Sequence, residues 1–191
     1  IFLQLRDVAS ELYGEEEGRQ IAEMIVLAKG AITRNELLIE ADKELEIKDI
    51  DAIIAQLREW RPVQYIIGEA SFDDMDLEVG EGVLIPRPET EELVEWIASE
   101  AQHSAKIVDV CTGSGCIGIS LKKYIKEAVV TMVDISEGAI SVAKENAQLN
   151  RADVKIVRDD VLNPSYEYEE YNLIVSNPPY IEEETISTLE K

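Results

Sequence analysis

From residue 107 onward the sequence alternates short apolar runs with amphipathic segments, and this alternation restricts the possible folds more than any other feature. Strands are predicted over 107–110, 129–134, 154–157 and 173–176, with helices over 117–124 and 136–149. Repeated strand–helix units of this length fold into a parallel, doubly wound α/β sheet of the Rossmann type. Because such sheets normally contain more than four strands, this one is expected to be truncated at its C-terminal end.

The first part of the chain has a different texture, with apolar residues at helical spacing. Helices are predicted up to Gly14, over 15–28, from a capping box at Thr33 and Glu36 onward, and over 47–60. The residue before a proline avoids the α region, so Arg61-Pro62 ends the last of these helices. Residues 1–61 are therefore expected to form a small helical bundle.

Between these regions, glycines separate short apolar pieces over 65–67, 77–79 and 83–85, which predict a strand pair. A further helix is predicted from the Pro86 to Thr90 segment to about Ser99. The expected domains are a helical bundle (1–61), a connector with a β-hairpin (62–85) and an α/β domain (86–191).

Composition limits the class of partner. The 191 residues include 40 acidic and 18 basic side chains, a net charge of −22. Nucleic acids are bound through clustered lysine and arginine, so direct nucleic-acid binding is disfavoured and a protein partner is favoured. The sequence predicts neither a membrane span nor a signal peptide. The two cysteines, Cys111 and Cys116, have a spacing that suits neither a disulfide framework nor a metal, so we expect a cytoplasmic protein without a metal site.

A glycine-rich turn follows the first predicted strand of the α/β region. Residues Gly113 to Gly118 fit G-x-G-x-x-G, and Asp134 ends the next strand 21 residues after Gly113. Such a turn lets backbone N–H groups approach a ligand, and a carboxylate in this place accepts hydrogen bonds from ribose hydroxyls. The pattern predicts a nucleoside-containing cofactor and leaves a dinucleotide and S-adenosylmethionine open. Glycines used only for helix–strand packing are the less favoured interpretation.

Other acidic residues lie near the same edge of the predicted sheet. Asp109 comes before the turn, where a carboxylate suits the ammonium group of a methionine-like moiety. Asp160 follows the third strand, where it or Val161 can meet an adenine edge. Each acid alone is more often a solvated or capping residue. Their coincidence at one sheet edge favours a binding site.

The segment Asn177-Pro178-Pro179-Tyr180 follows the fourth predicted strand, at the edge where open α/β sheets bind ligands. Its two prolines remove two N–H donors and leave carbonyls that only accept. A rigid group of acceptors beside an aromatic ring suits a planar group with N–H donors, such as an amide or the amino group of a base. The alternative is a stiff turn without a further role.

Together, V-D-V-C-T-G-S-G at 108–115, Asp134 and N-P-P-Y at 177–180 resemble the class I S-adenosylmethionine-dependent methyltransferases. More narrowly, P-V-Q-Y-I-I-G at 62–68 and L-I-P-R-P-E-T-E at 84–91 resemble the peptide chain release factor glutamine methyltransferases. The resemblance covers nearly the whole chain. It implies methyl transfer from S-adenosylmethionine to the side-chain amide of a glutamine, in the GGQ motif of a release factor that docks on the N-terminal helices.

The resemblance also implies roles for single residues. The methionine part of the cofactor is expected to contact Asp109 and the turn residues Cys111, Thr112, Gly113, Ser114 and Gly115. Asp134 is expected to bind the ribose, and Asp160 with Val161 the adenine. The expected catalytic loop is Asn177, Pro178, Pro179 and Tyr180, with Asn177 also beside the cofactor. The family usually begins its turn with glycine where this chain has Cys111.

Four alternatives stay open at this point. They are a glutamine methyltransferase acting on a ribosomal protein, an adenine amino-group methyltransferase of nucleic acids, a nicotinamide-dependent oxidoreductase and a non-catalytic binding module. The charge of −22 disfavours the nucleic-acid enzyme. An oxidoreductase has no use for the loop at 177–180.

Overall fold

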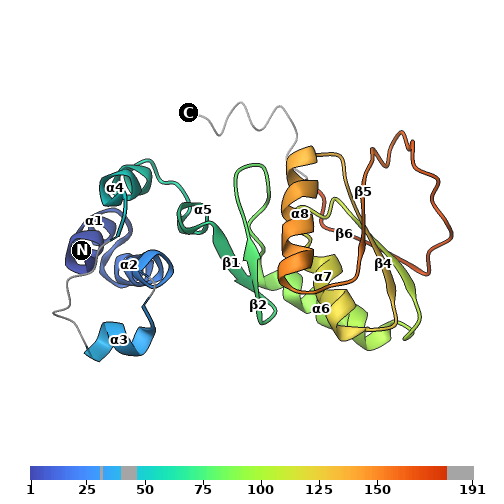
Figure 1. Cartoon of the computed structure of the whole chain (residues 1–191), viewed down its shortest axis with the longest axis horizontal. Helices are drawn as coiled ribbons and strands as arrows, with labels where there is room; N and C mark the ends of the chain where they lie inside the picture. Colours follow the sequence, from blue (N-terminus) through green and yellow to red (C-terminus); the bar gives the residue numbers. More distant parts are fainter. Residues whose placement is uncertain (31, 40–46, 180–191) are drawn as a thin grey trace. The chain divides into compact units, whose positions relative to one another are not determined.

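The computed structural model describes residues 1–30, 32–39 and 47–179 of the chain (Figure 1). The chain folds as two compact units, Ile1–Glu69 and Ala70–Lys191. Within the described ranges, no helix combines the length and the apolar character that crossing a membrane requires.

The first unit is helical, as the spacing of its apolar residues predicts. It contains α1 (Phe2–Tyr13), α2 (Glu15–Gly30), α3 (Arg34–Ile39), α4 (Ile50–Arg58) and α5 (Val63–Ile67). Helices α1 and α2 pack closely at Gly18, where an added Cβ would lie only 2.3 Å from the backbone N of Ser10. The buried apolar side chains of this unit include Leu5, Ala9, Ile21, Ala22, Ile25, Val26, Ile53, Leu57 and Ile66.

The capping box predicted at the start of α3 is confirmed. The backbone N of Thr33 donates to Glu36 Oε2 at 2.8 Å, and the backbone N of Glu36 donates to Thr33 Oγ1 at 3.3 Å. The helix predicted over 47–60 is shorter than expected. It begins only at Ile50, because Asp49 has a left-handed backbone with φ of 58°.

The connector differs from the prediction in two places. Residues 65–67, expected as a strand, belong to α5, which follows Pro62 and ends at Gly68 with φ of 91°. A run of three apolar residues fits a buried strand and a short buried helix equally well, so periodicity could not separate them. Residues 83–85, also expected as a strand, form none.

The second unit contains the α/β sheet. Its elements are β1 (Glu69–Phe72), β2 (Met75–Glu78), α6 (Pro88–Glu100), β3 (Lys106–Val110), α7 (Cys116–Tyr124), β4 (Val129–Asp134), α8 (Glu137–Leu149), β5 (Lys155–Arg158) and β6 (Leu173–Ser176). The strand order is β5-β4-β3-β6, and each neighbouring pair is parallel. The predicted doubly wound α/β class is therefore confirmed. The predicted bounds of two strands, 129–134 and 173–176, coincide with β4 and β6.

Strands β1 and β2 form a separate hairpin that is tied to the helices at both ends of β2. Its turn residues Asp73 and Asp74 have φ of 50° and 54°, as a type I′ turn requires. At this tip the backbone N of Asp73 donates to Glu91 Oε1 of α6 at 3.1 Å, and Tyr124 Oη of α7 donates to Asp73 Oδ1 at 2.7 Å. At the other end, the backbone N of Glu78 donates to Oδ1 of Asn146 in α8 at 2.6 Å.

The connection from β5 to β6, residues 159–172, contains no helix. It is held by Asp159, whose carboxylate accepts from the backbone N of Ser165 at 3.0 Å, from its Oγ at 2.7 Å and from the backbone N of Tyr166 at 3.3 Å. These hydrogen bonds to the ionised form lower the pKa of Asp159 to about 2. The first part of the connection is therefore closed into a loop by Asp159, although it lacks secondary structure.

Candidate functional site

The candidate site lies where β3, β4 and β6 end side by side. Val110 pairs with Val133 on one side and with Ser176 on the other. The residues that follow Val110, Val133 and Ser176 are Cys111, Asp134 and Asn177. The parallel register therefore brings three residues that were predicted separately as site residues to one edge of the sheet. Ser176 Oγ also donates to the carbonyl of Val110 at 2.7 Å, which fixes the end of β6 to the end of β3.

The glycine turn leaves this edge as a tight reversal. The backbone N of Gly115 donates to the carbonyl of Thr112 at 2.8 Å, and the backbone N of Thr112 donates to that of Val133 at 3.0 Å. Cys111, Gly113 and Gly115 have φ of 58°, 56° and 84°. Left-handed backbone is natural for glycine and costs energy at Cys111. The turn therefore has the shape that the motif predicts, with one strained residue at its start.

The last glycine of the motif serves packing. An added Cβ at Gly118 would lie 2.5 Å from both Cγ and Sδ of Met132, which is fully buried in β4. Because α7 approaches the sheet this closely, the backbone N of Gly118 reaches Asp109 Oδ2 at 3.1 Å. The packing interpretation of the glycines thus holds for Gly118.

Asp109 lies beneath the turn and supports it. Its side chain is fully buried, and Oδ2 accepts from Thr112 Oγ1 at 2.5 Å as well as from Gly118. Among the described residues, Oδ1 is buried and has no hydrogen-bond partner. Burial raises the pKa of Asp109 to about 7, although the bonds from Thr112 and Gly118 oppose the rise. An unpaired buried oxygen of this kind favours a cationic or N–H-bearing ligand.

Asp134 closes the other side of the turn. Its Oδ2 accepts from the backbone N of Gly113 at 3.0 Å, and its Oδ1 accepts from the backbone N of Ser136 at 2.9 Å. A carboxylate has about four acceptor positions, so this half-buried group keeps capacity for two hydroxyl donors.

Burial raises the pKa of the Cys111 thiol, and the charge of Asp134 adds to the rise. Cys111 is therefore a neutral residue beside a carboxylate.

Asp160 and Val161 lie after β5 and are less closely tied to the turn. Asp160 Oδ1 accepts from the backbone N of Leu162 at 3.0 Å, and Oδ2 accepts from Asn163 Nδ2 at 3.1 Å. The bond from Asn163, followed by that from Leu162, lowers the pKa of Asp160. The carboxylate thus shapes its own loop, while the exposed side chain of Val161 offers an apolar surface.

The loop after β6 is described in part. Asn177 is half-buried, whereas Pro178 and Pro179 are exposed. Tyr180 lies outside the described residues. The first three residues of the expected catalytic loop therefore begin at the same edge as the glycine turn.

One residue of the site was missed in the sequence. Asn146 is fully buried on α8 and donates from Nδ2 to the carbonyl of Ser114 at 2.9 Å. It follows Ala139, Ile140 and Ala143 on the apolar stripe of the predicted helix 136–149. A polar residue at a core position of an amphipathic helix was the signal that could have found it.

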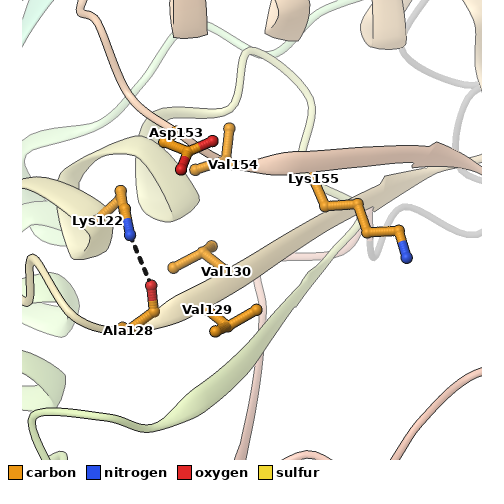
Figure 2. Close-up of a pocket in the computed structure, with 7 residues that line it drawn as sticks. All are labelled: Lys122, Ala128, Val129, Val130, Asp153, Val154 and Lys155. Carbon is orange, nitrogen blue, oxygen red and sulfur yellow. Dashed lines mark hydrogen bonds between the residues drawn. The ribbon is translucent and has the colours of Figure 1, made fainter.

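A hollow lies at the opposite edge of the sheet (Figure 2). It has a volume of about 230 Å³ and includes Val129 and Val130 at the start of β4 and Lys155 at the start of β5. Lys122 Nζ, which faces this hollow, already donates to the carbonyls of Lys126 and Ala128 at 2.9 and 2.7 Å. Among the described residues, no cluster of three or more histidine, cysteine or acidic side chains could hold a metal. The glycine-turn edge is thus the better candidate.

Comparison with known proteins adds independent information. The sequence profile of the family described as methyltransferase small domain matches residues 88–189. The release factor glutamine methyltransferase of Lactococcus lactis subsp. lactis is 44% identical over 76% of this chain and 53% of that protein. Proteins of the same name from Clostridium acetobutylicum and Flavobacterium psychrophilum are 42% and 37% identical, over 97% and 93% of this chain and 66% and 65% of theirs. The chain spans between about half and two thirds of these relatives' length.

Proposed function

Because the chain belongs to the methyltransferase small domain family, we propose that it belongs to an enzyme that methylates a glutamine side chain. The donor is S-adenosylmethionine, and the acceptor is the amide nitrogen of a glutamine in the GGQ motif of a peptide chain release factor. The names of relatives at 37–44% identity support this acceptor. The observation that carries the proposal is the register of Val110 with Ser176, which sets the glycine turn beside Asn177.

The residues at this edge fit the donor. The buried Oδ1 of Asp109 provides negative charge beneath the turn for the ammonium of the methionine moiety, which a dinucleotide lacks. Residues Cys111 to Gly115 wrap that moiety. Asp134 accepts from the ribose hydroxyls with its two remaining acceptor positions. Asp160 and Val161 border the adenine, Val161 through its exposed apolar side chain.

The loop at 177–180 acts on the acceptor. When bound, S-adenosylmethionine supplies an electrophilic methyl group on its sulfonium sulfur. An amide nitrogen is a poor nucleophile because its lone pair is delocalised into the carbonyl. Asn177 Oδ1 and the carbonyl of Pro178 accept the two amide hydrogens and so aim the nitrogen at the methyl group. Tyr180 packs on the amide plane. Alignment of well-positioned reactants can supply up to about 7–11 kcal/mol of barrier reduction.

The remaining parts of the chain have supporting roles in this proposal. Residues 1–61 form the surface on which the release factor docks, 62–85 connect it to the catalytic part, and 86–191 hold donor and loop. Methyl transfer breaks the bond between the methyl carbon and the sulfur and leaves S-adenosylhomocysteine as a neutral thioether. The methylated nitrogen then carries one excess proton, which passes to solvent by way of the oxygen of Asn177 or Pro178 that accepts it. A cytoplasmic location agrees with a translation factor as substrate.

Two measurements on the complete enzyme test the proposal. Calorimetry compares S-adenosylmethionine with NAD, and we expect binding of the methyl donor alone. Transfer of labelled methyl groups to release factors is then measured with the intact GGQ glutamine and with that glutamine replaced. Tighter binding of NAD would overturn the donor assignment, and labelling that survives the replacement would overturn the acceptor assignment.

A further inference from the structure

Asn146 makes three hydrogen bonds to the backbone of two distant segments. Its Oδ1 accepts from the backbone N of Glu78 at 2.6 Å, while Nδ2 donates to the carbonyls of Glu78 and Ser114, each at 2.9 Å. Both amide hydrogens and the amide oxygen are thus used. The side chain is fully buried, so each bond forms without competition from water.

The bond to Ser114 fixes the outgoing side of the glycine turn. In the peptide unit that joins Ser114 to Gly115, the carbonyl accepts from Asn146 and the N–H donates to Thr112. On the incoming side, the backbone N of Gly113 donates to Asp134. The Gly113–Ser114 peptide at the apex lies between these two fixed peptide units. Its orientation therefore depends on Asp134 on one side and on Asn146 on the other.

The two bonds to Glu78 fix the end of the hairpin. The amide of Asn146 pairs with the N–H and C=O of Glu78 as a neighbouring strand would. One helical turn later, Asn150 Nδ2 donates to the carbonyl of Asp76 at 3.2 Å. The chain that leaves Glu78 returns to the turn through buried Val83, since an added Cβ at Gly113 would lie 3.9 Å from Val83 Cγ1.

We propose that Asn146 is a positioning residue for the methyl-donor site, which couples the glycine turn to the end of β2. It acts on the ligand through Ser114 and does not touch it. This inference rests on the proposed function only in taking S-adenosylmethionine as the ligand of the turn. It also implies that occupation of the turn stabilises the end of the hairpin, because coupling between two sites is reciprocal.

Asn146→Asp is the direct test. An aspartate keeps the shape but has no N–H, and its charge lies against the carbonyls of Glu78 and Ser114. We expect S-adenosylmethionine to bind at least about tenfold more weakly, while kcat at saturating donor stays within about twofold. Gln148→Glu is the matched control, because it makes the same change of charge on an exposed residue of the same helix. A donor affinity of Asn146→Asp equal to that of the control would overturn the proposal.

Hydrogen exchange tests the coupling without a measurement of activity. In the ligand-free variant, we expect the amides of Glu78 and Gly115 to exchange at least about tenfold faster than in the wild type, while those of β3 keep their protection. An unchanged exchange rate at Gly115 would contradict the proposal that Asn146 holds the glycine turn. In the wild type, adding S-adenosylmethionine should slow exchange at Glu78. If the Asn146→Asp variant does not fold, this measurement on the wild type decides whether the two segments are coupled. Unchanged exchange at Glu78 in the donor-bound wild type would overturn the proposed coupling.

The two proposals fail in different ways. Absence of donor binding by the wild type would overturn the proposed function. In that case the ligand-free exchange rates of Glu78 and Gly115 still decide whether Asn146 joins the hairpin to the turn.

Discussion

Ser176 and Val110 lie opposite each other at the ends of β6 and β3, and the serine hydroxyl donates to the valine carbonyl at 2.7 Å. This bond adds a side-chain link to the backbone pairing of the two strands. It fixes the residue after each strand, Asn177 and Cys111, at the same level of the sheet. The loop that begins at Asn177 and the glycine turn that begins at Cys111 are therefore held by one local contact.

Asn177→Ala removes the proposed acceptor of an amide hydrogen. We expect methyl transfer by the complete enzyme to fall by at least about a hundredfold, the scale of losing a polar contact made to the transition state. Donor affinity, measured by calorimetry, should change little. Gln148→Ala, which removes an exposed amide from α8, is the control. Near-normal turnover of Asn177→Ala would rule out Asn177 as an acceptor of the amide hydrogen.

Asp109 should make stability depend on pH. Its pKa is raised from 3.8 to about 7 by burial, so between these values the folded protein binds a proton that the unfolded chain releases. Stability contributed by this group is highest below about pH 4, falls as pH rises, and is lower by on the order of 4 kcal/mol above pH 7. Asp109→Asn removes this dependence. Urea unfolding of both proteins from pH 5 to 8 measures it, and parallel curves would contradict a raised pKa.

Substitutions at Cys111 should reverse the usual order of alanine and glycine. With φ of 58°, an L-residue at this position costs about 1–2 kcal/mol. We expect Cys111→Gly to be more stable than Cys111→Ala by about 1 kcal/mol. Cys116, the first residue of α7, is the matched position, where alanine should be the more stable of the two. Thermal unfolding of the four variants provides the comparison. If the alanine variant were the more stable of the two at both positions, backbone strain at Cys111 would be excluded.

Gly118→Ala should be destabilising although it lies in a helix. The new Cβ would lie 2.5 Å from Met132 and 3.1 Å from Asp109 Oδ2, in a fully buried environment. We expect a loss of about 1–3 kcal/mol from overpacking. Gly138→Ala in α8 meets only Ser136 Oγ at 3.7 Å and should be stabilising by about 0.5–1 kcal/mol. Urea denaturation measures the change in the free energy of unfolding for each of the two variants. Equal effects would show that helix propensity, not packing, decides both.

The sequence predicted the parts of the molecule that depend on local periodicity. These parts include the bounds of β4 and β6 and the capping box of α3. The sequence also predicted that the strand ends lie at one edge, because that follows from a parallel sheet. The direct bond between Gly113 and Asp134 shows that those two residues lie together at the sheet edge.

What the sequence did not predict depends on distant partners or on short segments. Helix α5 is too short for its period to be read, and the strand expected over 83–85 is a loop that packs on Gly113 through Val83. The bonds of Asn146 join residues 68 and 32 positions away along the chain. Nothing local to Glu78 or Ser114 indicates such a partner.

The hairpin is tied at its tip through Asp73 and at its end through Glu78. The number of residues between these two ties is therefore set by the distance they must span. An inserted or deleted residue in β2 would also turn its alternate side chains to the opposite face. During evolution, length changes among relatives should accordingly be rare between Asp73 and Glu78.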